Sequence, residues 1–152
     1  MSHENVKIVR EFFGASERSL DAYWNNPRSL AAAMEAGELP PETAVAFGFI
    51  HPEAVWKTAT IGLTVQGHLE MLKGLDQFLE VADDYRATLR EVEDIGDDRV
   101  LATIDRVAKA KHTGIEMEAP LYSLCTVRDG LIVEMDEYAE RTDALEAAAL
   151  SE

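Results

Sequence analysis

The chain has 152 residues, of which 47% are hydrophobic, so we expect a single domain over residues 1–152 with a sizeable core. Its formal net charge of −15 should repel phosphate backbones and anionic lipid headgroups, which argues against nucleic acid or a membrane surface as a partner. The sequence shows no signal-peptide core and no apolar run of roughly 20 residues, and its single cysteine, Cys125, excludes an internal disulfide, so we expect a cytoplasmic protein.

Helical signals come first along the chain. Apolar residues at helical spacing predict a first helix from about residue 2 to residue 18: Val6, Val9, Phe12 and Phe13. The alanine-rich stretch 28–38, with Gly37 as a stop, predicts a second helix, and a short third helix should begin near Pro41. Segment 74–84 has its apolar side chains on one face and predicts a further short helix.

From Tyr85 onward the hydrophobic period changes to that of strands. Turn signals rich in Gly and Asp separate successive strand-length segments, and one more strand candidate precedes them: 53–60, 85–95, 98–111, 114–127 and 131–139. An alanine-rich helix from Arg141 to Leu150 should close the chain. This order predicts an α+β domain whose helices lie on one face of a curved antiparallel sheet.

Three stretches stand out by their residues and by their order in the chain: "ENVKIVREFF", "HPEAVW" and "TVRDGLIVEMDEYAERTDALEAAAL". They resemble the SnoaL-like branch of the nuclear transport factor 2-like superfamily, which also contains ketosteroid isomerase and limonene epoxide hydrolase. The resemblance implies a cone-shaped, curved antiparallel (mixed) sheet wrapped over N-terminal helices, an interior pocket, and a homodimer formed through the outer face of the sheet. It thins over Leu20–Phe49, where this chain is longer than usual.

The last two strands are joined by Asp129-Gly130, which predicts a two-residue hairpin loop with Arg128 opposite Leu131. Counting from this pair puts a mainly apolar set of side chains on one face, which we interpret as the pocket wall: Tyr122, Leu124, Val133, Met135 and Glu137. The opposite face is half polar and suits solvent or a partner subunit: Ser123, Cys125, Glu134, Asp136 and Tyr138.

Glu137 is the candidate functional acid. Burial among apolar side chains would raise its pKa and make it a general acid or base near neutral pH. The resemblance implies the same position, because Glu137 aligns with a catalytic aspartate of the epoxide hydrolase, and Tyr122 falls near an oxyanion-hole acid of ketosteroid isomerase. In the alternative interpretation Glu137 lies at a strand end, partly solvated and paired with an arginine.

The chain also departs from both enzymes. The epoxide hydrolase has an arginine and an aspartate where this chain has Ile104 and Arg106, so that triad is incomplete. Ketosteroid isomerase has a tyrosine on the first helix, where this chain has Phe12 and Phe13, so steroid isomerisation in its known form is not expected.

The loop around Thr113-Gly114 leaves two alternatives for the preceding strand. A two-residue loop would turn Asp105 inward beside Tyr122, whereas a three-residue loop would turn Arg106 inward. The resemblance favours Arg106, which would then pair with Glu137 and lower its pKa. The other possibility is a surface arginine on a strand.

The remaining predicted pocket residues are apolar. We expect seven side chains to contact a ligand: Phe12, Phe13, Trp24, Trp56, Leu124, Val133 and Met135. No pair of histidines has metal-ligand spacing, so no metal or other cofactor is expected, and His68 is the histidine closest to a predicted pocket mouth.

These features support two functional interpretations. In the first, an apolar pocket binds a small hydrophobic molecule, and Glu137, with Tyr122 or Arg106, carries out acid–base chemistry of the isomerase, cyclase or hydrolase type without a cofactor. In the second, the protein is a non-catalytic ligand-binding or dimeric assembly module whose interior is filled by large side chains. A cavity lined by Glu137 would favour the first interpretation.

Overall fold

The computed structural model describes residues 2–59 and 62–150 and confirms the α+β class expected from the sequence. In chain order the elements are α1 (Ser2–Asn25), α2 (Leu30–Glu35), α3 (Pro41–Phe47), β1 (Ile50–Lys57), β2 (Thr64–Gln66), α4 (His68–Leu79), β3 (Ala82–Gly96), β4 (Arg99–Ala110), β5 (Glu116–Arg128), β6 (Leu131–Tyr138) and α5 (Arg141–Leu150).

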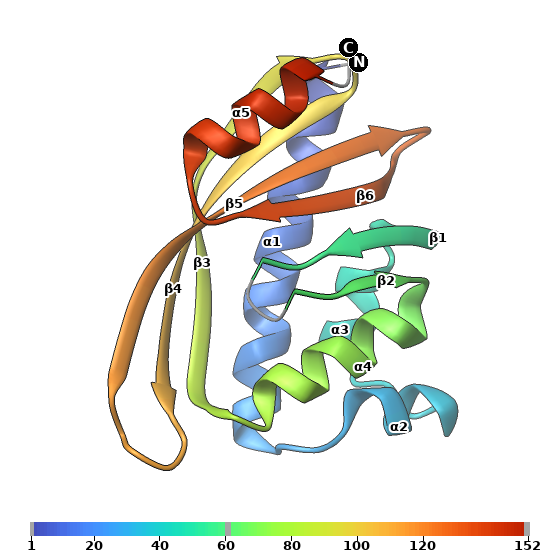
Figure 1. Cartoon of the computed structure of the whole chain (residues 1–152). Coiled ribbons are helices and arrows are strands. Elements are labelled where there is room, and N and C mark those ends of the chain that lie inside the picture. The colour runs from blue at the N-terminus through green and yellow to red at the C-terminus, as the bar shows by residue number, and fades with distance from the viewer. Residues whose placement is uncertain (1, 60–61, 151–152) are drawn as a thin grey trace.

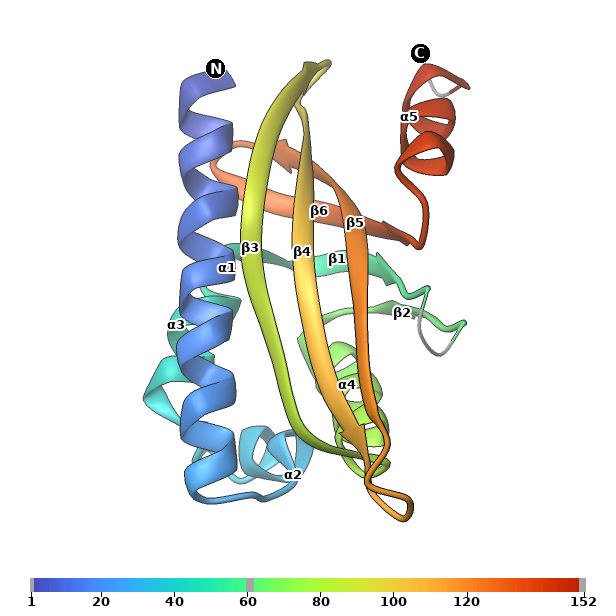
Figure 2. The ribbon, with the colours of Figure 1, turned by 90° about the vertical axis from the view of Figure 1, so that its left-hand side faces the viewer.

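The strands form one mixed sheet in the order β2-β1-β6-β5-β4-β3. Strand β1 runs parallel to β6, and the other neighbours are antiparallel. The sheet is strongly curved but open, with β2 and β3 as its edges (Figure 1). Helix α1 lies along one face and α5 on the opposite face (Figure 2), so the predicted sheet wrapped over N-terminal helices is confirmed.

The core lies between α1 and the inner face of the sheet. Its buried side chains come from α1 and from alternate positions of β4 and β5: Val9, Phe12, Ala15, Val100, Ala102, Ile104, Leu121, Cys125 and Val127. Cys125 is fully buried, as expected for a small apolar residue in mid-strand, and burial raises the pKa of its thiol to about 12. The thiol is therefore protonated at neutral pH and serves packing.

Several elements differ in length from the predictions. Helix α1 continues to Asn25 rather than ending near residue 18, because Leu20 is buried and the Trp24 indole N–H donates to the Tyr85 carbonyl oxygen at 2.8 Å. Helix α4 begins at His68, six residues before the predicted start, and β2 was not predicted from the sequence. The predicted end of the first strand, Thr60, lies outside the described residues.

The β5–β6 hairpin begins as predicted but changes register after two pairs, Arg128 with Leu131 and Val127 with Ile132. Arg128 is opposite Leu131, yet Thr126 pairs with Glu134, because Val133 is an extra, bulged residue on β6. Beyond the bulge Ser123, rather than Tyr122, is opposite Glu137. Since side chains alternate along a strand, this single residue reverses the predicted faces of β5.

The two predicted faces of β5 are exchanged in the structure. Ser123 and Cys125, expected on the outer face, are buried on the inner face, whereas Tyr122 and Leu124 lie on the outer face. Leu124 is nevertheless only 4% exposed, because α5 packs on β5 and β6 on that side. Helix α5 is also held by Arg141, whose guanidinium binds both carboxylate oxygens of Glu93 on β3 at 2.5 and 2.9 Å.

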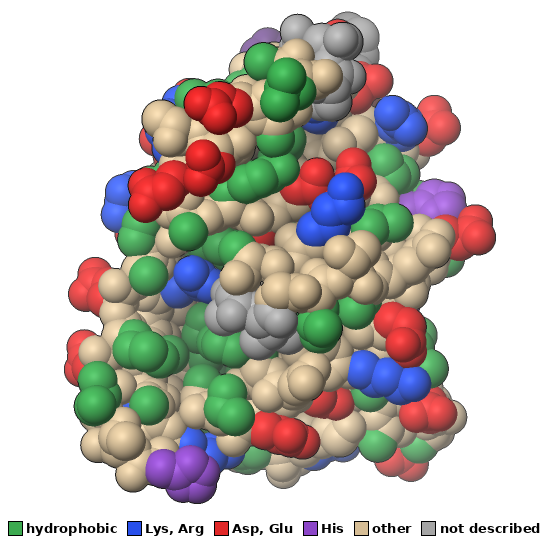
Figure 3. Space-filling view, viewed as in Figure 1, with side chains coloured by type: hydrophobic (Ala, Val, Ile, Leu, Met, Phe, Trp, Pro, Cys, Tyr) green, Lys and Arg blue, Asp and Glu red, His purple; other side chains and the backbone are tan. Residues whose placement is uncertain are grey.

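Acidic side chains are spread over the surface rather than gathered in one place. Figure 3 shows Asp and Glu side chains distributed over one face of the molecule, with Lys and Arg side chains between them. Several carboxylates are held in ion pairs, including Asp105 with Arg90 and Glu134 with Lys57. In the described part of the chain, no helix is long and apolar enough to cross a membrane.

Helix α2 is fixed to α4 by one carboxylate. Asp76 on α4 accepts hydrogen bonds from the backbone N–H groups of Leu30 and Ala31, at 2.9 and 3.1 Å, and from the Ser29 hydroxyl at 2.8 Å. Ser29 in turn caps the helix by accepting from the Ala32 N–H. The six-residue helix is too short to be stable alone, so this contact determines its position.

We therefore expect Asp76→Ala to lower the free energy of unfolding by about 2 kcal/mol, because it removes charged acceptors from a helix N-terminus. Urea unfolding of the variant would measure the loss. The matched control is Asp83→Ala at an exposed position, which should change stability by less than about 0.5 kcal/mol. Equal effects of the two substitutions would contradict the role of Asp76.

Candidate functional site

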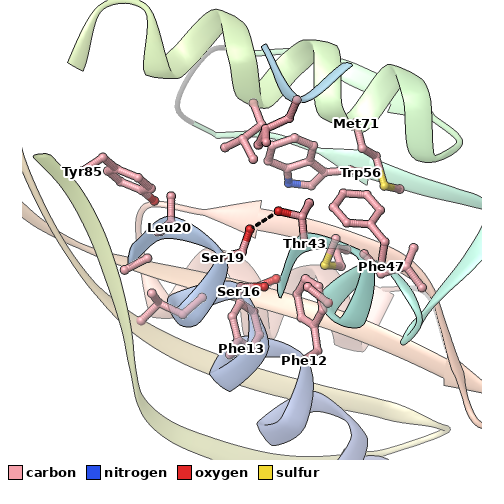
Figure 4. A pocket seen from close by; sticks show the side chains of 18 of the residues that line it. Phe12, Phe13, Ser16, Ser19, Leu20, Thr43, Phe47, Trp56, Met71 and Tyr85 are labelled. Atoms are coloured by element: carbon pink, nitrogen blue, oxygen red, sulfur yellow. Dashed lines mark hydrogen bonds between the residues drawn. The ribbon is translucent and has the colours of Figure 1, made fainter. Parts of the chain in front are cut away.

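A cavity of about 150 Å³ lies between the helices and the inner face of the sheet. Its walls are mainly apolar and include six aromatic side chains, five of which are labelled in Figure 4: Phe12, Phe13, Phe47, Trp56 and Tyr85, together with Tyr23. Edge-to-face contacts with other rings hold several of these aromatic side chains in place. Phe12 contacts Phe13 at 4.9 Å between ring centroids, Phe47 contacts His68 at 5.2 Å, and Tyr85 contacts Phe78 at 4.7 Å.

The helix side of the cavity carries a group of hydroxyls. Ser16 and Ser19 are three residues apart on α1 and therefore share the helix face that also carries Phe12. The Ser19 hydroxyl is 2.6 Å from that of Thr43 on α3, and both side chains are buried. Figure 4 shows these hydroxyls close together, with the Tyr85 hydroxyl pointing toward the same space.

On the sheet side, β6 places the Glu137 carboxyl in the cavity wall. The carboxyl accepts hydrogen bonds from the Trp56 indole N–H and, at 3.2 Å on Oε1, from the backbone N–H of Ala59. Burial raises the pKa of Glu137, while the Trp56 bond, the Ala59 bond and the charge of Arg106 act in the opposite direction. The pKa lies above the ordinary carboxyl value because desolvation is the largest contribution.

Arg106 and Tyr85 lie next to Glu137 in a smaller cavity of about 40 Å³, and Tyr85 and Glu137 line both cavities. The Arg106 side chain hydrogen-bonds the Tyr85 phenol, and because a guanidinium has only donors, the phenolic oxygen accepts. Burial raises the pKa of Tyr85 to about 12, so its O–H remains protonated at neutral pH. The Tyr85 proton can therefore be donated into the main cavity.

Of the two alternatives for β4, the structure has Arg106 on the inner face. The loop is longer than either predicted form: residues 111–114 connect Ala110 to Ile115, and the Ala110 N–H donates to the Ile115 oxygen at 2.9 Å. Asp105 points outward and pairs with Arg90. The inward position of Arg106 follows from the β4–β5 register, in which it is opposite Ala119.

The other predicted site residues divide into two groups. Four of the predicted ligand contacts line the cavity: Phe12, Phe13, Trp56 and Met135. Trp24, Leu124 and Val133 do not, because Trp24 fastens α1 to β3, Leu124 faces outward and Val133 is the bulged residue. Tyr122 lies on the outer face, opposite Tyr138, and is not in the cavity.

His68, the histidine expected nearest the pocket, does not line the cavity either. Its Nε2 is 2.9 Å from the Ile50 carbonyl oxygen. Among residues 2–59 and 62–150, no group of three or more His, Cys, Asp and Glu side chains could hold a metal ion.

Sequence reasoning missed six polar residues of the cavity: Ser16, Ser19, Tyr23, Thr43, Tyr85 and Ser123. A signal was present for two of them, since Ser16 and Ser19 interrupt the apolar face of the first helix at helical spacing. Tyr85 alternates with Ala87 and Leu89 at the start of a strand, which marks a shared face without saying which face is inner.

The raised pKa of Glu137 predicts how a neutral replacement behaves with pH. Below the ordinary carboxyl pKa the group is protonated in both the folded and the unfolded chain, so its burial carries no charge penalty. As the pH rises, the unfolded chain releases the proton first, and the wild-type protein loses stability until the folded pKa is passed. Gln is nearly isosteric and stays neutral.

We therefore expect the stability of Glu137→Gln relative to wild type to be greater at about pH 8 than at about pH 4. Urea unfolding at both pH values measures the difference. Glu134→Gln, on the outer face of the same strand, is the matched control and should not show this gain. A difference for Glu137→Gln that does not change with pH would contradict the raised pKa of Glu137.

Comparison with known proteins agrees with this architecture. A family model described as a SnoaL-like domain matches residues 28–135. No curated protein matches the chain in sequence. Solved structures with the same fold include an NTF2-like protein from Burkholderia thailandensis E264, with 19% identity, 97% of each chain covered and a TM-score of 0.64.

Two further solved structures are similar. One is a putative SnoaL-like polyketide cyclase from Jannaschia sp. CCS1, with 15% identity over 97% of this chain and 92% of that chain and a TM-score of 0.61. The other is TerC co-crystallized with polyporic acid, with 17% identity over 94% of this chain and 96% of that chain and a TM-score of 0.63. At these identities the likeness shows a shared fold. Because the family model covers well over half of the residues, the chain belongs to the SnoaL-like domain family.

Proposed function

We propose that this protein binds a small, mainly apolar molecule in the cavity and transfers a proton on it through Glu137. The observation that carries the proposal is the position of a desolvated carboxyl in the wall of an apolar cavity. A carboxyl with a raised pKa is a better general base than an exposed one and still exchanges its proton near neutral pH.

The surrounding groups suit proton abstraction next to a carbonyl. In this step the Glu137 carboxylate takes a proton from the carbon beside the carbonyl, and the electron pair of that C–H bond forms an enolate. The Tyr85 O–H can donate to the enolate oxygen where negative charge develops. Arg106 is a positioning residue, because its bond to the phenolic oxygen leaves the Tyr85 proton for the ligand.

Two outcomes are open to the enolate. Return of the proton from Glu137 to a different carbon gives an isomer. Alternatively, attack of the enolate carbon on a second carbonyl of the same molecule closes a ring, and the alkoxide formed from that carbonyl takes the proton back from Glu137. The putative polyketide cyclase and TerC with its bound polyporic acid support a small organic ligand for this fold. They concern proteins below 25% identity, so the reaction proposed here depends on Glu137 and Tyr85.

The alternative is a non-catalytic binding module with a filled interior. A cavity lined by Glu137 favours the proposal, since large side chains do not fill this space. The two functions differ in whether a bound ketone exchanges its acidic hydrogens.

The test is hydrogen–deuterium exchange of two ketones in D₂O, followed by NMR: cyclohexanone, with one ring, and 2-decalone, with two. Exchange of either above the buffer rate supports proton transfer. Glu137→Gln should lower that exchange by about 10²–10⁴-fold, the usual contribution of a general acid or base. In the wild type the rate should rise with pH through the raised pKa of Glu137, because the base is the carboxylate.

Glu134→Gln is the control for this experiment, because it removes a carboxylate of the same strand on the outer face. It should keep the wild-type exchange rate. Equal rates in wild type and Glu137→Gln would remove Glu137 as the proton-transferring group. Ketone binding without any exchange would favour the non-catalytic module.

We also propose a homodimer formed through the outer face of the sheet. The face carries the adjacent tyrosines Tyr122 and Tyr138, which are partly exposed on the single chain and suit an interface. Ser123 and Cys125 no longer support this proposal, because they are buried on the inner face.

Light scattering at micromolar concentration should therefore give twice the chain mass of 16.8 kDa. Tyr122→Asp should shift the protein toward the monomer, because a desolvated charge at an interface is costly. Val45→Asp, at an exposed apolar position on α3, should not. A wild-type monomer under these conditions would disprove the dimer.

A further inference from the structure

The cavity has a definite size and polar groups on two of its walls, and together these restrict the class of ligand. Its volume of about 150 Å³ equals that of an engineered apolar cavity that accommodates one benzene ring. The cavity is partly open to solvent, so this volume limits the enclosed part of a ligand, and a second fused ring would lie at the opening or require the walls to move apart. The size of the space therefore selects for a single six-membered ring or a chain of similar volume.

The aromatic walls resist such movement. Phe12, Phe47 and Tyr85 each pack edge-to-face on another ring, so turning one of them away from the cavity would break a second contact. Trp56 is held by its hydrogen bond to Glu137, and its ring lies against Gly74 of α4, where an added Cβ would be 3.5 Å from the ring. These contacts keep the cavity near its observed volume.

The polar groups are divided between two walls. Ser16, Ser19 and Thr43 belong to α1 and α3, whereas Glu137 belongs to β6 of the sheet. The bond between Ser19 and Thr43 uses one of their two hydroxyl protons, so the other can be donated to a ligand oxygen. Both side chains are less than 10% exposed, and a buried hydroxyl gains from a partner.

We infer that the ligand is a single-ring, non-aromatic compound with two oxygen functions on different ring positions: a carbonyl next to Glu137 and a hydroxyl or second carbonyl at Ser19 and Thr43. This rests on the proposed function only for the carbonyl, because the ring size and the second oxygen follow from the cavity and the helix-side hydroxyls.

The test compares three ketones by calorimetry: cyclohexanone, 4-hydroxycyclohexanone and 2-decalone. The hydroxyketone should bind roughly fivefold more tightly than cyclohexanone, although it is the more polar molecule, because it gains a hydrogen bond to the Ser19–Thr43 pair. The two-ring ketone should bind more weakly than cyclohexanone. Without a size limit each added methylene would instead tighten binding about fourfold.

Ser19→Ala should abolish the advantage of the hydroxyketone and leave cyclohexanone binding nearly unchanged. Thr103→Val is the matched control, because Thr103 is a buried hydroxyl residue on β4 that lies outside the cavity. It should keep the advantage. Should Ser19→Ala fail to fold, the order of the three ketones on the wild-type protein still decides the size limit.

The outcomes separate this inference from the proposed function. Tighter binding of 2-decalone, or no preference for the hydroxyketone, would overturn the ligand class even if Glu137-dependent deuterium exchange takes place. Tight binding of 4-hydroxycyclohexanone to both wild type and Glu137→Gln, with no exchange in either, would support the ligand class and overturn the proton transfer.

Discussion

The β-bulge at Val133 is the feature on which the candidate site depends. Side chains alternate along a strand, so one extra residue on β6 changes which side chains of β6 face the interior beyond it. Ile132 faces inward before the bulge, and Met135 and Glu137 face inward after it, where Glu134 and Asp136 would otherwise lie. Glu137 is therefore opposite Ser123 rather than the outward-facing Tyr122, and the site is created by an irregularity in an otherwise regular hairpin.

Opposing contributions set the pKa of the largely buried Glu137 carboxyl. Trp56 and Ala59 donate hydrogen bonds to the carboxyl, and Arg106 is close enough for its charge to lower the pKa of Glu137. Desolvation nevertheless has the largest effect, so Glu137 retains its proton to a higher pH than an exposed glutamate does. Arg106 acts on Tyr85 as well, and one cation thus organises both the acid and the hydroxyl.

Helix α4 contacts both α2, through Asp76, and the Trp56 ring of β1, through Gly74. Asp76 holds the N-terminus of α2, which brings Leu30 to the cavity, and Gly74, two residues earlier, lies against the Trp56 ring. The indole of Trp56 in turn binds Glu137. The position of the short N-terminal helices and the geometry of the acid therefore depend on neighbouring residues of one helix.

The sequence by itself determined the α+β class, the closing helix and the first two pairs of the last hairpin, because these depend on local periodicity and on turn residues such as Asp129-Gly130. It also indicated Glu137, through the count along this hairpin and through the family resemblance. The tertiary structure alone decided that Tyr85 rather than Tyr122 accompanies it. The bulge in β6 and the length of the β4–β5 loop set the registers of these strands, and neither can be predicted from hydrophobic periodicity. The inner face of β5 is therefore known only from its pairing with both neighbouring strands.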